Sequence, residues 1–176
     1  KSEQCYDHSA GHPSENKLYP IEILARDTVN DLLVGKINKK NNAFLNLSNE
    51  IFLGEDIIVA GYPLSLKINS KTIKVNKGII SSISGVDNNY SDIQFDAAIQ
   101  PGNSGSPVLN QYGGLVAIAK SSITSAQNTN FAVKSSILKI FLESNGIKFY
   151  NNENKQTKST IELSKKLDAT TIQIFC

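Results

Sequence analysis

The sequence predicts an all-β domain, either a barrel or a sandwich, because short β-prone segments recur between turn signals along most of the chain. With 176 residues and 40% hydrophobic side chains, the chain is long enough to bury one globular core. Its net charge of +2 and its lack of long basic runs argue against a nucleic-acid partner. No apolar run approaches the roughly 20 residues that a membrane span needs.

The first predicted strand shows an alternating pattern, with Ile21, Ile23 and Ala25 at every second position. Further β-prone segments occur at residues 32–34, 56–62, 72–84, 92–99, 115–120 and 130–133. Turn-forming Gly, Asn and Pro residues separate them, as at 41–42, 54–55, 85–89 and 113–114. This regular spacing of short strands favours an antiparallel barrel or sandwich.

The tail of the chain changes character. Apolar residues at helical spacing from Ile137 to Leu142 predict a helix, with Ser135 and Ser136 as its N-cap and Gly146 at its C-terminal stop. The rest of the tail comprises a polar loop or linker at 151–158, a capping-box pattern at 159–162 that opens a second short helix, and a β-prone segment at 171–175.

Two cysteines, Cys5 and Cys176, and two histidines, His8 and His12, are the only soft metal ligands. Structural zinc sites usually need four such ligands at close spacing, so we predict no metal site. We interpret both histidines as surface residues of a loop that ends at Pro13. Because the termini of a domain often lie close together, a Cys5–Cys176 disulfide is one hypothesis, and two unpaired thiols are the other. A disulfide would indicate an oxidising compartment.

The sharpest local feature is the glycine-flanked serine of PGNSGSP, residues 101–107. Catalysis by serine needs a hydroxyl on a tight turn and backbone N–H groups that converge on one oxygen. Gly102 has no side chain where the backbone must turn, so its N–H and that of Ser104 can face the same atom, and Gly105 allows close approach just beyond. The same loop is also typical of a simple β-turn. Asp31 is a candidate for the carboxylate that orients a base, and on its own it is typical of a turn residue.

Further motifs accompany this loop: YPIEILARD at 19–27, NDLLVGKI at 30–37, LGED at 53–56, AGYPL at 60–64, KGIISSI at 77–83, DAAIQPGNSGSP at 96–107 and NFAV at 130–133. In this order they resemble the landmarks of the chymotrypsin-fold serine proteases of the HtrA/Deg type, or of bacterial trypsin-like peptidases close to them. Ser106 stands where a second glycine is common in that family. The resemblance covers roughly residues 19–146, and several landmarks in order are far more specific than one.

The resemblance implies a chymotrypsin-like double β-barrel whose first barrel is incomplete in this chain. We expect a remnant of the N-terminal barrel at residues 1–50 and a C-terminal barrel with the nucleophile loop at 51–134. A helix, a polar linker, a short helix and a terminal strand would follow at 135–176. Nothing after Gly146 resembles a PDZ domain, so the oligomer-plus-PDZ scheme of HtrA proteins is not implied.

The resemblance also implies catalytic roles. Ser104 matches the nucleophile, and Asp31 matches the acid of the catalytic triad. The N–H groups of Gly102 and Ser104 match the oxyanion donors.

Substrate-binding positions are implied in the same way. Ala98 falls where trypsin-like enzymes place the base of the primary specificity pocket, with Ile99 beside it. A small, uncharged residue there suggests apolar P1 side chains. Residues 117–120, including Ala119 and Lys120, would pair with the substrate backbone by strand addition.

The triad histidine is the main departure from the family pattern. Counted back from Asp31, its position falls at or just before Lys1. His8 and His12 lie 23 and 19 positions upstream of Asp31 and lack the N-x-H-V-V context of the family, although SAGH at 9–12 resembles the T-A-G-H of other trypsin-like enzymes. We therefore expect the histidine and the first strands to precede residue 1, and the absence of Met fits a chain that begins downstream of a start. His12, and after it His8, is the alternative candidate for the base.

Three functional hypotheses follow. The leading one is a serine endopeptidase that forms an acyl-enzyme at Ser104, with its base upstream of residue 1. The second is a catalytically inactive trypsin-fold pseudo-protease that binds a peptide or protein, and the third is a structural β domain whose loop is only a turn. The expected partners are a peptide or protein substrate and the chain's own upstream segment, with no cofactor. The expected location is extracytoplasmic, either periplasmic or secreted.

Overall fold

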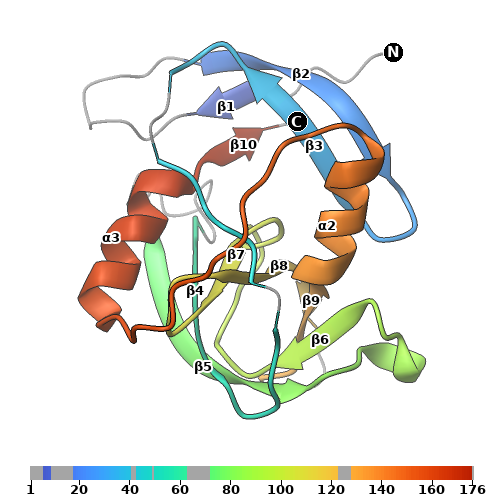
Figure 1. The fold of residues 1–176 in the computed structure, drawn as a ribbon. Coiled ribbons are helices and arrows are strands. Elements are labelled where there is room, and N and C mark those ends of the chain that lie inside the picture. The colour runs from blue at the N-terminus through green and yellow to red at the C-terminus, as the bar shows by residue number, and fades with distance from the viewer. Residues whose placement is uncertain are drawn as a thin grey trace.

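The computed structural model describes residues 6–8, 18–40, 43–48, 50–62, 72–122 and 128–175. Its strands are β1 Tyr6–His8, β2 Leu18–Asp27, β3 Leu32–Ile37, β4 Asp56–Gly61, β5 Lys74–Ser82, β6 Asp92–Phe95, β7 Pro107–Asn110, β8 Leu115–Ser122, β9 Asn130–Lys134 and β10 Gln173–Phe175. The helices are α2 Ser135–Ser144, α3 Thr160–Thr170 and a short 3₁₀ helix, Val86–Asn88. Figure 1 shows their arrangement. No helix in the described ranges is long and apolar enough to cross a membrane.

Six strands form a closed antiparallel barrel in the order β4-β5-β6-β9-β8-β7. Its interior contains fully buried apolar side chains from neighbouring strands, among them Ile80, Ile93, Phe95, Val108 and Val116. Full burial of one such side chain stabilises the fold by about 1.5–3 kcal/mol. The expectation of an all-β, chymotrypsin-like fold is confirmed by this barrel and by the structural comparison given below.

The second sheet has four strands in the order β10-β1-β2-β3, and the described part of it is open. β2 and β3 form a hairpin, and β1 pairs antiparallel with β2 on one side and with β10 on the other. The last strand of the chain therefore lies beside the first (Figure 1). An open sheet here agrees with the expected incomplete first barrel. The division of the chain at residues 50 and 134 remains a proposal.

Helix α2 joins the two sheets. Phe141 of α2, Leu32 of β3 and Val133 of β9 form one buried apolar cluster. The predicted N-cap of this helix was wrong: Lys134 is the N-cap, without a side-chain capping bond. The Ser135 hydroxyl instead donates to the Ser48 carbonyl at 2.8 Å, because Ser135 is already buried against that loop. Gly146 follows the helix with φ +67°, as its predicted role as a stop requires.

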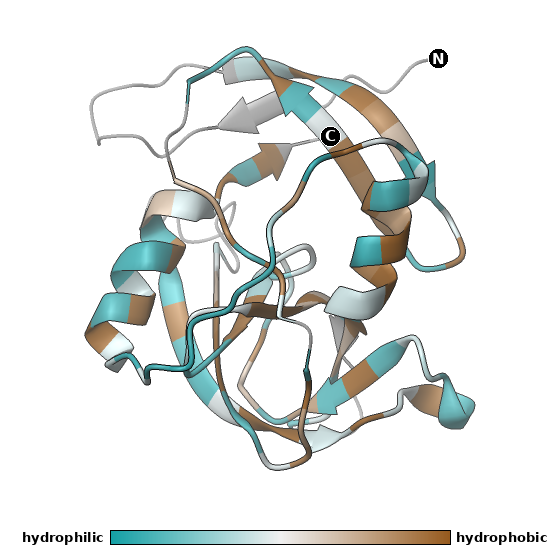
Figure 2. Ribbon diagram, in the orientation of Figure 1, coloured by the Kyte–Doolittle hydropathy of each residue, from teal (hydrophilic) through white to brown (hydrophobic). Residues whose placement is uncertain are grey.

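Helix α3 packs the tail onto the barrel. Leu163 and Leu167 are buried in a cluster with Ile58 of β4 and Leu109 of β7. The predicted capping box is present, since Ser159 and Glu162 exchange side-chain and backbone hydrogen bonds. Figure 2 shows alternating hydrophilic and hydrophobic bands on α2 and α3, and a hydrophilic linker that leads into α3.

Two expectations from the sequence need correction. The strand predicted over residues 92–99 ends at Phe95. At the next residue the Asp96 N–H donates to the Ile79 carbonyl at 3.3 Å, and the return bond from the Ile79 N–H goes to the Asp96 carboxylate at 2.6 Å instead of to a backbone carbonyl. His8 lies in strand β1, so it is not a loop residue. His12, Cys5 and Cys176 lie outside the described residues.

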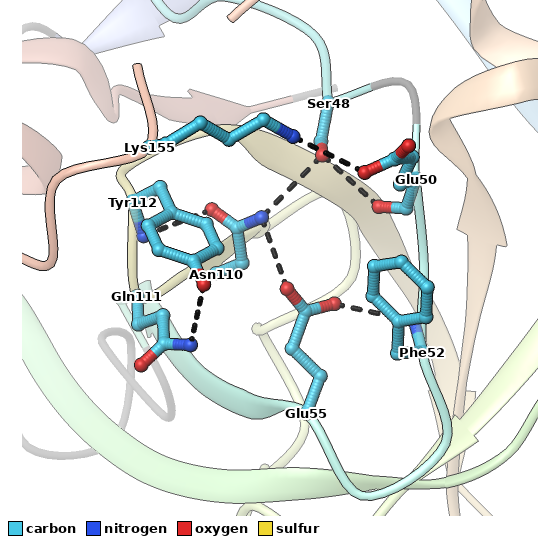
Figure 3. A network of polar contacts seen from close by, with 8 residues as sticks. All are labelled: Ser48, Glu50, Phe52, Glu55, Asn110, Gln111, Tyr112 and Lys155. Carbon is cyan, nitrogen blue, oxygen red and sulfur yellow. Dashed lines mark hydrogen bonds and ion pairs between the residues drawn. The ribbon is translucent and has the colours of Figure 1, made fainter. Parts of the chain in front are cut away.

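A buried polar network fixes the far end of β7 (Figure 3). Asn110, only 3% exposed, donates to Glu55 Oε1 at 3.1 Å and to Ser48 Oγ at 3.4 Å. Its own Oδ1 accepts from the backbone N–H groups of Tyr112 and Gly114 at 3.2 and 3.0 Å. The Asn110 side chain thereby satisfies two backbone N–H groups of the turn between β7 and β8, and it connects this turn to the segment before β4.

We predict that the packing of α3 on the barrel contributes strongly to stability. Leu167→Ala should lower the free energy of unfolding by about 2–5 kcal/mol, because Leu167 is fully buried. Ile161→Ala on the same helix is the matched control, since Ile161 is 69% exposed and its truncation should cost less than about 0.5 kcal/mol. Urea unfolding measures both, and equal effects would show that α3 does not pack as described.

Glu55 should give stability a specific pH dependence. Burial raises the pKa of its carboxyl above the ordinary value of 4.5, and hydrogen bonds from Phe52 and Asn110 oppose this only in part. As pH rises through 4.5, the unfolded chain loses this proton before the folded chain does. The free energy of unfolding should therefore fall as pH rises through this window, and Glu55→Gln should remove that slope. Urea unfolding between pH 4 and 8 measures it, with Glu143→Gln on α2 subtracted as the exposed-carboxylate background.

Candidate active site

The glycine-flanked serine lies in a loop of two consecutive tight turns between β6 and β7. The Asn103 N–H donates to the Gln100 carbonyl and the Ser106 N–H donates to the Asn103 carbonyl, each at 3.0 Å. Gly102 and Gly105 have φ angles of +98° and +84°, which residues with side chains rarely adopt. The two glycines therefore permit the turns, and Ser104 between them is exposed.

Strand β8 fixes the position of this loop. The Gly105 N–H donates to the Ala119 carbonyl at 2.7 Å, and the Ala119 N–H donates to the Ser106 carbonyl at 2.8 Å. The Ser104 hydroxyl donates to the Lys120 carbonyl at 2.9 Å. The candidate nucleophile is thus directed toward the end of β8.

Two backbone donors of the loop differ from their neighbours. The N–H groups of Asn103, Gly105 and Ser106 all donate to backbone carbonyls. Those of Gly102 and Ser104 make no backbone hydrogen bond within the described part of the chain. These are the two groups that the sequence suggests as oxyanion donors, and they remain available for a developing negative charge.

A pocket of about 250 Å³ opens beside the loop. Its lining comes from three parts of the chain: Gly61 and Tyr62 at the end of β4, the loop residues 102 and 104–106, and the C-terminal segment Thr171–Ile174. No sequence pattern predicts that the C-terminal segment lines this pocket, because local patterns do not encode a contact between residues so far apart. Its β-prone composition predicted only a strand.

Gly61 has a steric role that its motif alone did not reveal. A side chain there would overlap the Ser106 hydroxyl and lie 2.8 Å from Asn103 Oδ1. Asn103 is 3% exposed, and its Oδ1 has no hydrogen-bond partner among the described residues. Because Gly61 has no side chain, the loop can pack against the end of β4.

The proposed substrate-binding residues come from two parts of the chain, the segment before the loop and strand β8. Ala98 is exposed, and its carbonyl accepts from Asn76 Nδ2 at 2.8 Å, while Ile99 packs against the barrel core. Ala119 is buried in β8, and the Lys120 ammonium lies 3.7 Å from Asp92 Oδ2. None of these four residues lines the pocket beside Ser104.

Asp31 lies in the turn between β2 and β3. It is exposed, has φ +57°, and makes no side-chain hydrogen bond to a described residue; it does not line the pocket beside Ser104. The turn is shaped by Asp27, whose carboxylate accepts from the Val29 and Asn30 N–H groups at 3.0 and 3.1 Å and from Asn30 Nδ2 at 2.7 Å. These bonds, the one from the Asn30 side chain first, lower the pKa of the Asp27 carboxyl. The structure brings Ser104, Gly102 and β8 together, and it leaves Asp31 outside this group.

Comparison with known proteins assigns the chain to a family. The model of the trypsin-like peptidase domain matches residues 4–118, which is more than half of the chain. The chain belongs to the trypsin-like peptidase family. An uncharacterized protein of Sinorhizobium fredii, y4bJ, is 30% identical over 98% of this chain and 29% of its own length. This trypsin-like peptidase chain thus spans less than a third of that relative.

Two further relatives agree. An HtrA-like serine protease of Staphylococcus aureus is 33% identical over 68% of this chain and 17% of its own length. The crystal structure of a serine endoprotease from Yersinia pestis superposes with a TM-score of 0.62 at 26% identity, over 75% of this chain and 46% of the other. The resemblance to HtrA-type, trypsin-like proteases is therefore confirmed, and so is the fold.

We predict that Gly61→Ala displaces the loop. The added methyl would overlap the Ser106 side chain, and such overpacking typically costs about 1–3 kcal/mol of stability. Replacing Ser106 by Gly in the same chain should restore part of the lost stability, because it removes the main clash. Thermal unfolding of the two single variants and the double variant measures the coupling, and simple additivity of the two single effects would contradict the described contact.

Proposed function

We propose that this chain carries the nucleophile of a serine endopeptidase, with Ser104 attacking the peptide carbonyl and Asp31 as the acid of the triad. The base would be a histidine upstream of residue 1. The single observation that supports this best is that the N–H groups of Gly102 and Ser104 make no backbone hydrogen bond to a described residue and lie beside an exposed hydroxyl on a tight turn. Family membership and the HtrA-like relative support the same reaction class.

The reaction would proceed through an acyl-enzyme. Ser104 Oγ bonds to the carbonyl carbon while its proton passes to the histidine, and the carbonyl oxygen becomes an oxyanion held by the two N–H groups. Collapse of this intermediate breaks the peptide C–N bond, and the histidine gives the proton to the leaving amine. Water then attacks the ester in the same way, releases the acid and restores Ser104.

The hydrogen bond from Ser104 to Lys120 bears on this scheme. In this arrangement the hydroxyl proton points to a backbone carbonyl, so the bond must be exchanged for one to the base before attack. Without a base, an oxyanion site retains only a small part of the rate of a full triad. We therefore expect the 176-residue chain alone to be a poor catalyst.

The substrate would be a peptide or protein. An extended segment would add to β8 near Ala119 and Lys120, and Ala98 and Ile99 would admit an apolar P1 side chain. The upstream segment that carries the base would be a second, intramolecular partner. We also propose an extracytoplasmic location, which the hypothesis of a disulfide between Cys5 and Cys176 would require.

A second candidate function is an inactive peptide-binding module. Two observations favour it: Asp31 has no hydrogen-bond partner in the described ranges, and the Ser104 hydroxyl is bonded to a backbone carbonyl. Such a module would keep the pocket and the β8 edge and would not cleave the peptide.

Labelling with a fluorophosphonate discriminates between the two functions. The full-length native protein should gain one phosphonyl group at Ser104, because only an activated serine displaces fluoride at a useful rate. Peptide mapping by mass spectrometry locates the group. Asp31→Asn should lower the labelling rate by roughly 10²–10⁴-fold if Asp31 orients the base.

Ser104→Ala should abolish labelling, and Ser106→Ala serves as the matched control in the same loop. Loss of labelling in both variants would point to a disturbed loop, which circular dichroism and the thermal midpoint would show. If the folded full-length protein does not label and still binds an extended apolar peptide, the inactive module is the correct function.

A further inference from the structure

The residues that follow α3 form one wall of the pocket beside Ser104, and the proposed reaction does not use them. Residues 171–174, called the C-terminal wall from here on, line this pocket of about 250 Å³ together with the end of β4 and the nucleophile loop. They lie beyond residues 4–118, the part of the chain that the trypsin-like peptidase model matches. The role of this wall must therefore be inferred from its own residues.

The C-terminal wall is attached at both ends. At its start, the Thr171 N–H donates to the carbonyl of Leu167 at 2.8 Å, and Leu167 of α3 is fully buried against the barrel. At its end, Gln173 and Ile174 pair with strand β1 in the open sheet. A segment that is held on both sides keeps its side chains at fixed positions, as a selective binding surface requires.

The chemistry of the pocket is uncharged. Among the described residues that line it, none is acidic or basic. Its largest open apolar groups are Ile172 and Ile174 of the wall, which are 37% and 50% exposed. A charged side chain that enters the pocket would lose hydration without an ionic partner from these residues, whereas an apolar side chain would cover the two isoleucines. The described lining therefore favours an apolar group.

The size of the pocket fits a single side chain. Sites for cofactors and other small molecules usually have volumes of about 300–1,000 Å³, and this pocket is smaller. Because Gly102 and Ser104 also line it, a group inside it lies next to the atoms that would hold the reacting carbonyl. A side chain of a peptide bound at Ser104 meets both conditions.

The position of the pocket indicates which half of the peptide reaches it. In the proposed function, the residues before the scissile bond add to β8 near Ala119 and Lys120. None of residues 115–120 of β8 lines the pocket. A peptide that follows β8 up to Ser104 therefore reaches the pocket only with residues beyond the scissile bond. Because an extended chain advances about 3.3–3.6 Å per residue, these are the first two residues after that bond.

From the lining, size and position of the pocket we propose that the C-terminal wall selects an apolar side chain at one of the first two residues after the scissile bond. Ile172 and Ile174 are the specificity-determining residues. This inference rests on the proposed function, because the direction of the peptide is taken from it. The uncharged lining and the two exposed isoleucines do not depend on it.

Cleavage-site profiling tests the proposal directly. The full-length native protein is incubated with a library of fully randomised decapeptides, and mass spectrometry identifies the products. At one of the two positions after the scissile bond, Leu, Ile, Val and Phe should be preferred over Gly, Asp and Lys by about 10-fold. Cleavage without such a preference at either position would overturn the proposal.

Charged variants of the wall should change this preference. Ile172→Asp and Ile174→Asp should each lower the apolar preference and increase cleavage before Lys or Arg, because a carboxylate then faces the bound side chain. Ile161→Asp on α3 is the matched control, since Ile161 is 69% exposed and does not line the pocket, and its profile should stay that of the wild type.

Ile172→Ala keeps this test valid if the aspartate variants fail to fold. It should reduce the apolar preference about 3-fold without adding a charge, and circular dichroism verifies the fold of each variant. Profiles identical to the wild type in all folded variants of the wall would contradict the proposal.

Photo-crosslinking tests occupancy of the pocket without cleavage. The probe is a peptide that the wild type cleaves or, if it cleaves none, a peptide that the full-length Ser104→Ala protein retains from the same library. Photo-leucine replaces each of its residues in turn. Irradiation of the complex with Ser104→Ala should join one of these positions to residues 171–174, as peptide mapping would show. Crosslinks confined to other segments, or no retained peptide, would overturn the proposal.

Fluorophosphonate labelling separates the failure of the two proposals. If Ser104 is labelled and the cleavage profile shows no selection after the scissile bond, the protease function stands and the role of the wall is rejected. If Ser104 is not labelled and photo-leucine crosslinks to residues 171–174, the protease function is rejected and the wall remains a binding surface for an apolar peptide side chain.

Discussion

Closure of the six-stranded barrel is the constraint on which the candidate site depends. In the order β4-β5-β6-β9-β8-β7, β6 and β7 follow each other in the chain and are never neighbours in the barrel. The chain between Phe95 and Pro107 must therefore cross one end of the barrel. A crossing without strand pairing has to satisfy its own backbone groups, and it does so with two tight turns and bonds to β8. Within the described ranges this arrangement leaves the N–H groups of Gly102 and Ser104 without a backbone partner, and the proposed chemistry needs these two groups.

The C-terminal residues from α3 onward add a pocket wall to the loop at the end of the barrel. α3 is attached to the outside of the barrel by Leu163 and Leu167, and the residues after it pass the Ser104 loop before they pair with β1. One segment therefore connects the closed barrel, the open sheet and the candidate site. The apolar cluster of Leu32, Val133 and Phe141 is a second junction between the same two sheets.

Local patterns in the sequence predicted most strands, both helices, the capping box and the nucleophile loop, because alternation, caps and turn residues act within a few positions. Long-range relations had no such signal. Three contacts join residues far apart in the chain. β1 pairs with β10, the Ser106 side chain packs where Gly61 has none, and Thr171–Ile174 lines the pocket beside Ser104. The N-cap of α2 was misplaced for the same reason: Ser135 has the right local chemistry for a cap, yet its hydroxyl is used by the distant Ser48 carbonyl. The motif match could not predict that Asp31 is exposed, because a motif gives the order of residues along the chain and not their positions in space.

The hydrogen bond from Ser104 to Lys120 shows how close this site is to a catalytic arrangement. A neutral hydrogen bond contributes about 1 kcal/mol net, so its exchange for a bond to a well-positioned imidazole would be nearly balanced in free energy. Two features that an oxyanion site would need are present: Gly102 and Gly105 have positive φ angles, and the N–H groups of Gly102 and Ser104 make no backbone hydrogen bond to a described residue. For the proposed reaction, the further requirement is a base within hydrogen-bond reach of Ser104 Oγ.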